Sequence, residues 1–222
     1  ALDRAISNDE FVVYYQPRAF AHNGEFASME ALVRWRDPDR GLIPPIEFIS
    51  IAEQSRLIIP LGDLVVEKVC KQLSSWRDQG SLLKQVSINV SALQLSDDKL
   101  RLTMKHNLEK YQLPASLIAI ELTESSILED DGSAIEELQR LREMGIELQI
   151  DDFDTGYSSL SKLQSLDIDV VKIDQSFVYK LATDHQSKAL CETIVSIGRS
   201  LDIAIVAEGV ETSEQLQLLK AM

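Results

Sequence analysis

The chain has 222 residues, of which 45% are hydrophobic and 26% charged, a balance typical of one large globular α/β domain. Its 36 acidic and 22 basic side chains give a net charge of −14, which argues against binding a nucleic acid polymer through a broad basic surface. The two cysteines, Cys70 and Cys191, are interpreted as buried thiols in a reducing compartment, and the sequence contains neither a membrane-spanning apolar run nor a signal-peptide pattern.

The beginning of the chain predicts an antiparallel hairpin. Phe11–Tyr15 is a strand-like run closed by Gln16-Pro17, and Asn23-Gly24 is a hairpin turn signal before a second strand over Ala27–Trp35. Helices are expected around this hairpin, over residues 2–6, 46–54 and 60–79.

From residue 85 onward, strands and helices alternate regularly. Strands are expected over residues 85–90, 117–122, 148–150, 170–173 and 203–207. Helices are expected over residues 97–111, 133–144, 157–166, 184–201 and 212–222. Continuous apolar strands alternating with helices indicate parallel strands that are buried on both faces. An open doubly wound sheet and a closed (β/α) barrel both fit this rhythm, and we expect residues 1–222 to form a single domain.

Polar side chains at the strand ends favour the barrel. A barrel brings the carboxyl ends of all its strands to one ring, whereas an open sheet spreads them along a line. Five consecutive parallel strands carry such groups at or near their carboxyl ends: Asn89, Glu121, Asp151 with Asp152, Lys172 and Glu208.

These residue types, together with Glu30, favour a hard divalent cation. Carboxylate and amide oxygens suit Mg²⁺ or Mn²⁺, and none of the three histidines stands at a strand end, so a zinc site is not expected. The adjacent carboxylates of Asp151 and Asp152 can serve two ions, as in two-metal phosphodiester hydrolysis. Lys172, desolvated beside cations, could orient or deprotonate the attacking water.

Each of these residues also has a purely structural interpretation. A single acid at a strand end is usually a helix cap or an ion-pair partner, and Lys172 could simply neutralise the two aspartates. The recurrence of such groups on five successive strands is what favours a functional site.

The motifs carried by these residues resemble those of the EAL family, bacterial phosphodiesterases of cyclic di-GMP. The resemblance covers essentially the whole chain, in family order. It includes Tyr15-Gln16-Pro17, Glu30-Ala31-Leu32-Val33-Arg34-Trp35, Ile88-Asn89-Val90-Ser91, Glu121-Leu122-Thr123-Glu124, Asp151-Asp152-Phe153, Thr155-Gly156-Tyr157-Ser158-Ser159, Lys172-Ile173-Asp174 and Ala207-Glu208-Gly209-Val210-Glu211.

The resemblance implies a TIM-like (β/α) barrel with an antiparallel first strand, and a role for each matching residue. It implies metal ligation by Glu30, Asn89, Glu121, Asp151 and Asp152, with Glu208 close to the metals and their water. It implies catalytic roles for Lys172, Glu30, Glu208 and Asp152, substrate contacts by Gln16, Leu32 and Arg34, and supporting roles for Glu124, Asp174 and Glu211.

The reaction that the resemblance implies is hydrolysis of cyclic di-GMP to linear pGpG with two Mg²⁺ or Mn²⁺ ions, with Ca²⁺ as an inhibitor. It further implies a cytoplasmic homodimer, within a larger signalling protein that carries sensory or GGDEF-type domains and that is either cytoplasmic or anchored to a membrane elsewhere. This domain itself is expected to make no membrane contact.

Two departures from the family pattern stand out. The family usually has glycine where this chain has Asp154, and the chain stops at Met222, before the family's last strand and its glutamine. A catalytically silent EAL-like receptor of cyclic di-GMP is therefore the alternative prediction. A barrel hydrolase with another phosphodiester substrate is less favoured, because Gln16, Leu32 and Arg34 also match the family.

Overall fold

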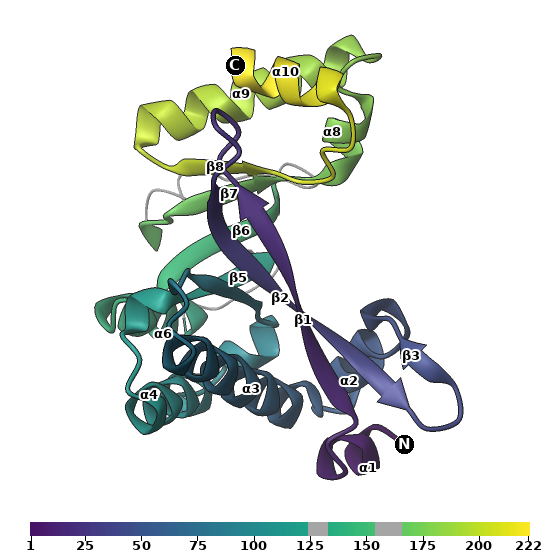
Figure 1. The fold of residues 1–222 in the computed structure, drawn as a ribbon, viewed down its shortest axis with the longest axis vertical. Coiled ribbons are helices and arrows are strands. Elements are labelled where there is room, and N and C mark those ends of the chain that lie inside the picture. The colour runs from purple at the N-terminus through teal and green to yellow at the C-terminus, as the bar shows by residue number, and fades with distance from the viewer. Residues whose placement is uncertain (124–132, 154–165) are drawn as a thin grey trace.

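A single curled β-sheet organises the part of the chain that this computed structural model describes, residues 1–123, 133–153 and 166–222 (Figure 1). Its strands are β1 (Phe11–Ala19), β2 (Phe26–Asp37), β3 (Gly41–Ile43), β4 (Val86–Asn89), β5 (Ile118–Thr123), β6 (Glu147–Phe153), β7 (Val170–Ile173) and β8 (Ala204–Ala207). The α-helices are α1 (Leu2–Ser7), α2 (Ile49–Gln54), α3 (Ile58–Asp78), α4 (Lys99–Tyr111), α6 (Ser133–Glu143), α8 (Gln175–Lys180), α9 (His185–Leu201) and α10 (Ser213–Ala221). Short 3₁₀ helices cover Pro45–Glu47, Ala92–Leu95 and Ala115–Leu117.

The order of the strands follows the chain. β1 pairs antiparallel with β2, and β4, β5, β6, β7 and β8 then follow in parallel. The sheet curls strongly enough for Lys172 on β7 to contact Glu30 on β2, although three strands lie between them. The predicted antiparallel first strand is confirmed, and so is the barrel-like curl.

Several element boundaries differ from the predictions. β1 continues through Pro17 to Ala19, because an edge strand tolerates a residue without an N–H. The predicted helix over residues 46–54 begins instead as a 3₁₀ turn. The short strand β3 and the short helix α8 were not predicted. Most of the helix expected over residues 157–166 lies outside the described residues.

Two apolar clusters hold the described elements together. The larger lies between the parallel strands and their helices, and it includes Leu73 of α3, Met104 of α4 and Leu141 of α6. The smaller is formed by residues between Leu2 and Leu61, and in it the rings of Phe11, Trp35 and Phe48 pack with centroids 5.4–6.3 Å apart. α3 belongs to both clusters, since Leu61 packs in the smaller one and Val65 in the larger.

The packing of α9 against β8 leaves little room at Gly198. A Cβ atom added there would lie 2.7 Å from the side chain of Ile205 and 2.9 Å from the carbonyl oxygen of Ile203. We therefore expect Gly198→Ala to lower the free energy of unfolding by about 1–3 kcal/mol, although alanine favours helix more than glycine does. Urea denaturation measures this change, with Ser196→Ala, at an exposed position of the same helix, as the control. Equal stability of Gly198→Ala and the wild type would contradict the tight packing.

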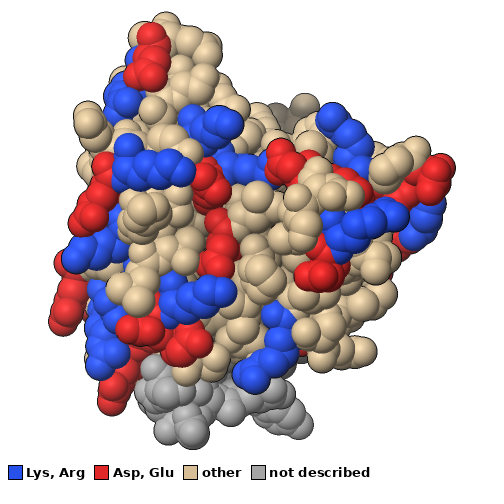
Figure 2. Space-filling model, turned by 90° about the horizontal axis from the view of Figure 1, so that it is seen from below, with Lys and Arg blue, Asp and Glu red and all other residues tan. Residues whose placement is uncertain are grey.

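The surface carries both signs of charge. Figure 2 shows basic side chains separated by acidic ones on the face seen from below. Within the described residues, no helix has the length and apolar character needed to cross a lipid bilayer.

Candidate active site

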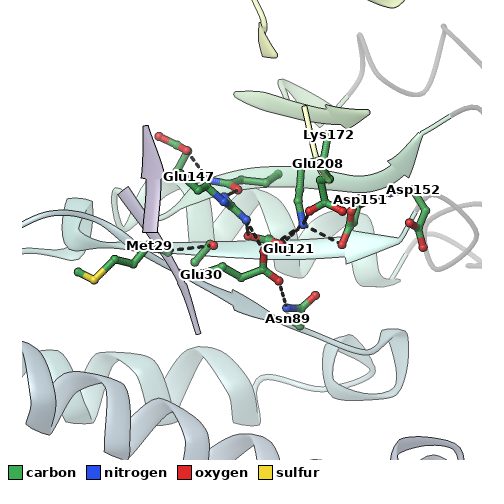
Figure 3. Close-up of polar contacts among 12 residues, drawn as sticks. Met29, Glu30, Asn89, Glu121, Glu147, Asp151, Asp152, Lys172 and Glu208 are labelled. Atoms are coloured by element: carbon green, nitrogen blue, oxygen red, sulfur yellow. Dashed lines mark hydrogen bonds and ion pairs between the residues drawn. The ribbon is translucent and has the colours of Figure 1, made fainter. Parts of the chain in front are cut away.

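Lys172 is the centre of a cluster of charged side chains inside the curl of the sheet. It lies on β7, whose four residues are all buried, and its side chain is only 1% exposed. Its Nζ atom lies 2.5 Å from Oε2 of Glu121 on β5, 2.9 Å from Oδ2 of Asp151 on β6 and 2.7 Å from Oε1 of Glu208 after β8 (Figure 3). Glu30 of β2 is a fourth neighbour, with Oε2 3.5 Å away.

The register of the parallel strands explains this convergence. Asn89 at the end of β4 pairs with Glu121, and Thr123 of β5 pairs with Asp151. The carboxyl ends of neighbouring strands therefore lie close to one another around the curled sheet, as expected for a barrel. Burying a lysine is costly unless carboxylates pair with it, so this cluster depends on all of its members together.

Arg18 supplies a second cation that was not predicted. Its Nη2 atom lies 2.7 Å from Oε2 of Glu30 and 2.5 Å from Oε1 of Glu121. Its Nη1 donates to Oε1 of Gln149 on β6, at 2.9 Å. The two oxygens of Glu121 thus contact different cations, one Arg18 and the other Lys172.

Arg18 was missed because the strand was interpreted as closing at Gln16-Pro17. In a continuous strand, Gln16 and Arg18 point to the same face, so extending β1 by two residues would have placed a guanidinium beside Glu30. Gln149 gave no clear signal, because it stands between the apolar residues Leu148 and Ile150 and is itself 2% exposed.

These contacts shift the acidity of the cluster. Burial lowers the pKa of Lys172, but attraction to Glu121, Asp151, Glu30 and Glu208 outweighs it, so the pKa is raised and the ammonium form is held. Burial alone would raise the pKa of Glu30, yet Lys172, Asn89 and Arg18 together lower it. The amide of Asn89 donates to Oε1 of Glu30 at 2.9 Å.

Asp152 lies on the far side of Asp151 as seen from Lys172 (Figure 3), and its backbone has an unusual φ angle. Its φ of +53° is left-handed, and the pairing of β6 with β7 is irregular between Ile150 and Phe153. Burial and the neighbouring charges of Asp151 and Asp174 raise the pKa of Asp152, which also shares a hydrogen bond with Asp174. Asp174, predicted as a supporting acid, thus lies beside Asp152, and it also caps α8 by accepting from the amide of Ser176.

The donors in this cluster fit a hard divalent cation. Five carboxylates, those of Glu30, Glu121, Asp151, Asp152 and Glu208, outnumber the two cations within reach, and all the candidate ligand atoms are oxygens. Within the described residues, however, no three acidic, histidine or cysteine side chains already converge as a bound ion requires. The ammonium and guanidinium groups instead hold the carboxylates.

The residues expected to contact substrate share one face of the β1–β2 hairpin. Gln16 pairs with Glu30, and Leu32 and Arg34 follow Glu30 at alternate positions of β2. Because alternate residues of a strand point the same way, all three lie on the face of Glu30. Leu32 and Arg34 are half-buried and Gln16 is exposed, which leaves this face accessible beside the charged cluster.

One predicted position, Glu211, is not brought into the cluster. Glu211 is exposed before α10, and only its backbone N–H has a hydrogen bond with the described part of the chain, to Gln215. Glu124 and Asp154 lie outside the described residues.

The fold and the site define an α/β barrel domain with an acidic centre at the carboxyl ends of its strands. The chain belongs to the EAL domain family, whose family model matches residues 1–222. Phosphodiesterases of this family are generally metal-dependent, in agreement with the oxygen-rich donor set.

Curated relatives and solved structures agree with this assignment. The cyclic di-GMP phosphodiesterase PdeR of Escherichia coli (strain K12) is 42% identical over 214 residues, which cover 96% of this chain and 32% of PdeR. The oxygen sensor protein DosP of the same organism is 41% identical over 220 residues, covering 99% of this chain and 28% of DosP. The chain thus spans about a third of the length of these relatives, or less.

Among solved structures, the PaMucR phosphodiesterase in complex with c-di-GMP superposes with a TM-score of 0.93 at 38% identity, covering 99% of this chain and 89% of that one. This similarity confirms the predicted TIM-like barrel architecture.

Proposed function

We propose that this domain is a metal-dependent phosphodiesterase that hydrolyses cyclic di-GMP to linear pGpG. The observation that carries the proposal is the convergence of Lys172 with carboxylates from β2, β5, β6 and the end of β8, in a chain of the EAL family. The similarity to a phosphodiesterase solved in complex with c-di-GMP supports the choice of substrate.

The oxygens of the cluster are the proposed ligands of two Mg²⁺ or Mn²⁺ ions. Glu30, Asn89, Glu121, Asp151 and Asp152 would hold them, and Glu208 would lie close by. When bound, such ions polarise the phosphoryl oxygen, acidify a water molecule and stabilise the leaving alkoxide. Calcium, which prefers a looser and larger coordination shell, is expected to permit substrate binding without turnover.

Lys172 is proposed to orient the attacking water. Of the two roles considered from the sequence, orientation and deprotonation, the geometry favours orientation, because Nζ of Lys172 donates hydrogen bonds to Glu121 and Asp151. Its burial among four carboxylates fixes where those hydrogen bonds point.

Gln16, Leu32 and Arg34 are proposed to hold the dinucleotide. Their shared face adjoins Glu30, and the guanidinium of Arg34 is well suited to a phosphate because it presents paired donors. In this structure its Nη1 donates to the carbonyl oxygen of Val33 at 2.8 Å, so phosphate would compete with a neutral acceptor only.

The relatives support a larger protein as the setting of this domain. Because the chain spans about a third of PdeR and DosP or less, we propose that it works as one EAL domain beside sensory or GGDEF-type domains in a larger cytoplasmic signalling protein. The relative MucR of Pseudomonas aeruginosa is named a bifunctional diguanylate cyclase and phosphodiesterase, which supports this arrangement. We also propose that the domain forms a homodimer.

Turnover of cyclic di-GMP tests the function directly. We expect Mg²⁺- or Mn²⁺-dependent production of pGpG, measured by chromatography, and loss of that production in Glu30→Ala. A parallel titration in Ca²⁺ reports binding without hydrolysis. Tight binding with no turnover in any divalent cation would favour the silent receptor, provided that a chain extended past Met222 is also silent. Absence of both binding and turnover would reject the proposal.

A further inference from the structure

Arg18 occupies the position between two proposed metal ligands. Its Nη2 atom is within 2.7 Å of Glu30 and 2.5 Å of Glu121, and its side chain is only 12% exposed. Glu121 is fully shielded from solvent, so its Oε1 depends on Arg18 for a partner. In the absence of ions, removal of this guanidinium would leave a buried carboxylate oxygen unpaired, which is costly.

The same contacts place Arg18 in competition with a metal ion. Oε1 of Glu121 contacts Arg18 and Oε2 contacts Lys172, so a divalent cation at either oxygen would lie beside one of these two positive charges. Oε2 of Glu30 contacts Arg18 and Oε1 accepts from Asn89. A positive charge this close to the ligands also repels an incoming cation.

A second hydrogen-bonding site for Arg18 already exists deeper in the sheet. Nη1 of Arg18 donates to Oε1 of Gln149, whose Nε2 donates to Glu147 at 2.8 Å. Gln149 is almost completely buried, so this acceptor is held in place. The guanidinium can therefore keep one anchor while it releases the two carboxylates.

We propose that Arg18 is an internal counter-cation that sets the metal affinity of this site. It neutralises Glu30 and Glu121 in the metal-free domain and releases them when divalent ions bind. This inference rests on the proposed function, because it assumes that Glu30 and Glu121 are metal ligands. Arg18 is thus a positioning residue, acting on the proposed reaction through the carboxylates it holds.

Calorimetric titration with Mn²⁺ alone tests this role without measuring activity. We expect Arg18→Gln and Arg18→Met to bind Mn²⁺ about tenfold more tightly than the wild type, because a competing positive charge is lost. Arg18→Lys, which keeps the charge, should remain closer to the wild type. Arg101→Gln is the matched control, since Arg101 also pairs with a buried carboxylate, Glu137, away from the cluster.

Thermal unfolding gives a second readout. The melting temperature of Arg18→Gln should fall in the metal-free state and recover on addition of Mn²⁺, so that the metal-induced shift exceeds that of the wild type. If the melting temperature of Arg18→Gln falls equally with and without Mn²⁺, and its Mn²⁺ affinity is unchanged, the role of Arg18 is merely structural. That result would overturn the inference. Weaker Mn²⁺ binding in both variants would overturn it as well. A wild type that binds no Mn²⁺ would reject the proposed metal site itself, whereas normal wild-type binding with unaltered variants rejects only the role of Arg18.

Discussion

Replacing Lys172 with methionine is expected to lower the turnover of cyclic di-GMP by about 10²- to 10⁴-fold, the range found when a positioned proton-transfer or water-orienting group is removed. Methionine keeps most of the length and apolar volume of the side chain but has no ammonium group. Four carboxylates surround that group at 2.5–3.5 Å, so its removal takes away a hydrogen-bond donor that all four share. Single-turnover kinetics in saturating Mn²⁺ measure the effect.

Substrate binding should survive this change. The residues proposed to hold the dinucleotide come from β1 and β2, whereas Lys172 comes from β7, so the affinity measured in Ca²⁺ should stay within about threefold. Lys180→Met, at an exposed position of α8, is the matched control and should leave both quantities unchanged. Unaltered turnover in Lys172→Met would refute the assigned role, and a parallel loss of binding would show that the lysine organises the whole site.

Glu121→Gln is expected to lower turnover to a similar extent, because it lowers the affinity of the site for metal ions. The substitution preserves shape but removes the charge from the most deeply buried carboxylate of the cluster, whose side chain is fully shielded from solvent. A neutral amide is a much weaker ligand of Mg²⁺ or Mn²⁺, so binding of Mn²⁺ should weaken by at least about 100-fold and turnover should fall with it.

Glu137→Gln separates this effect from a general loss of stability. Glu137 is also buried, at 3% exposure, and pairs with Arg101, but it lies on α6 away from the cluster. Both variants should lose unfolding free energy, and only Glu121→Gln should lose Mn²⁺ binding. Comparable Mn²⁺ affinities in the two variants would exclude Glu121 as a ligand.

The sequence predicted the frame of this site because that frame depends on alternation and strand ends. Apolar strands followed by Glu121, Asp151 and Glu208 can be recognised one at a time, and a barrel is what brings them together. The structure confirms that they meet at Lys172. The roles assigned to them in metal binding and catalysis remain predictions.

What the sequence did not predict depends on contacts between distant segments. Arg18 meets Gln149, 131 residues away, and no local pattern of either strand specifies that pair. The left-handed backbone of Asp152 was equally hidden, because aspartate in a strand-like run gives no sign of a positive φ. Asp152 shares a hydrogen bond with Asp174, the N-cap of α8, which is a further contact between separate segments.

The separation of the apolar side chains into two clusters bears on how the molecule fluctuates. Arg34 lies on β2 directly before Trp35, which packs in the smaller cluster, whereas Lys172 is surrounded by strands of the larger one. A cluster with few members opens at a lower free energy than the core of a domain. Transient opening of the smaller cluster would therefore loosen Arg34, which is proposed to hold a phosphate, more readily than Lys172. The proposed ligand contact of Arg34 and the proposed catalytic role of Lys172 would thus belong to regions of different rigidity.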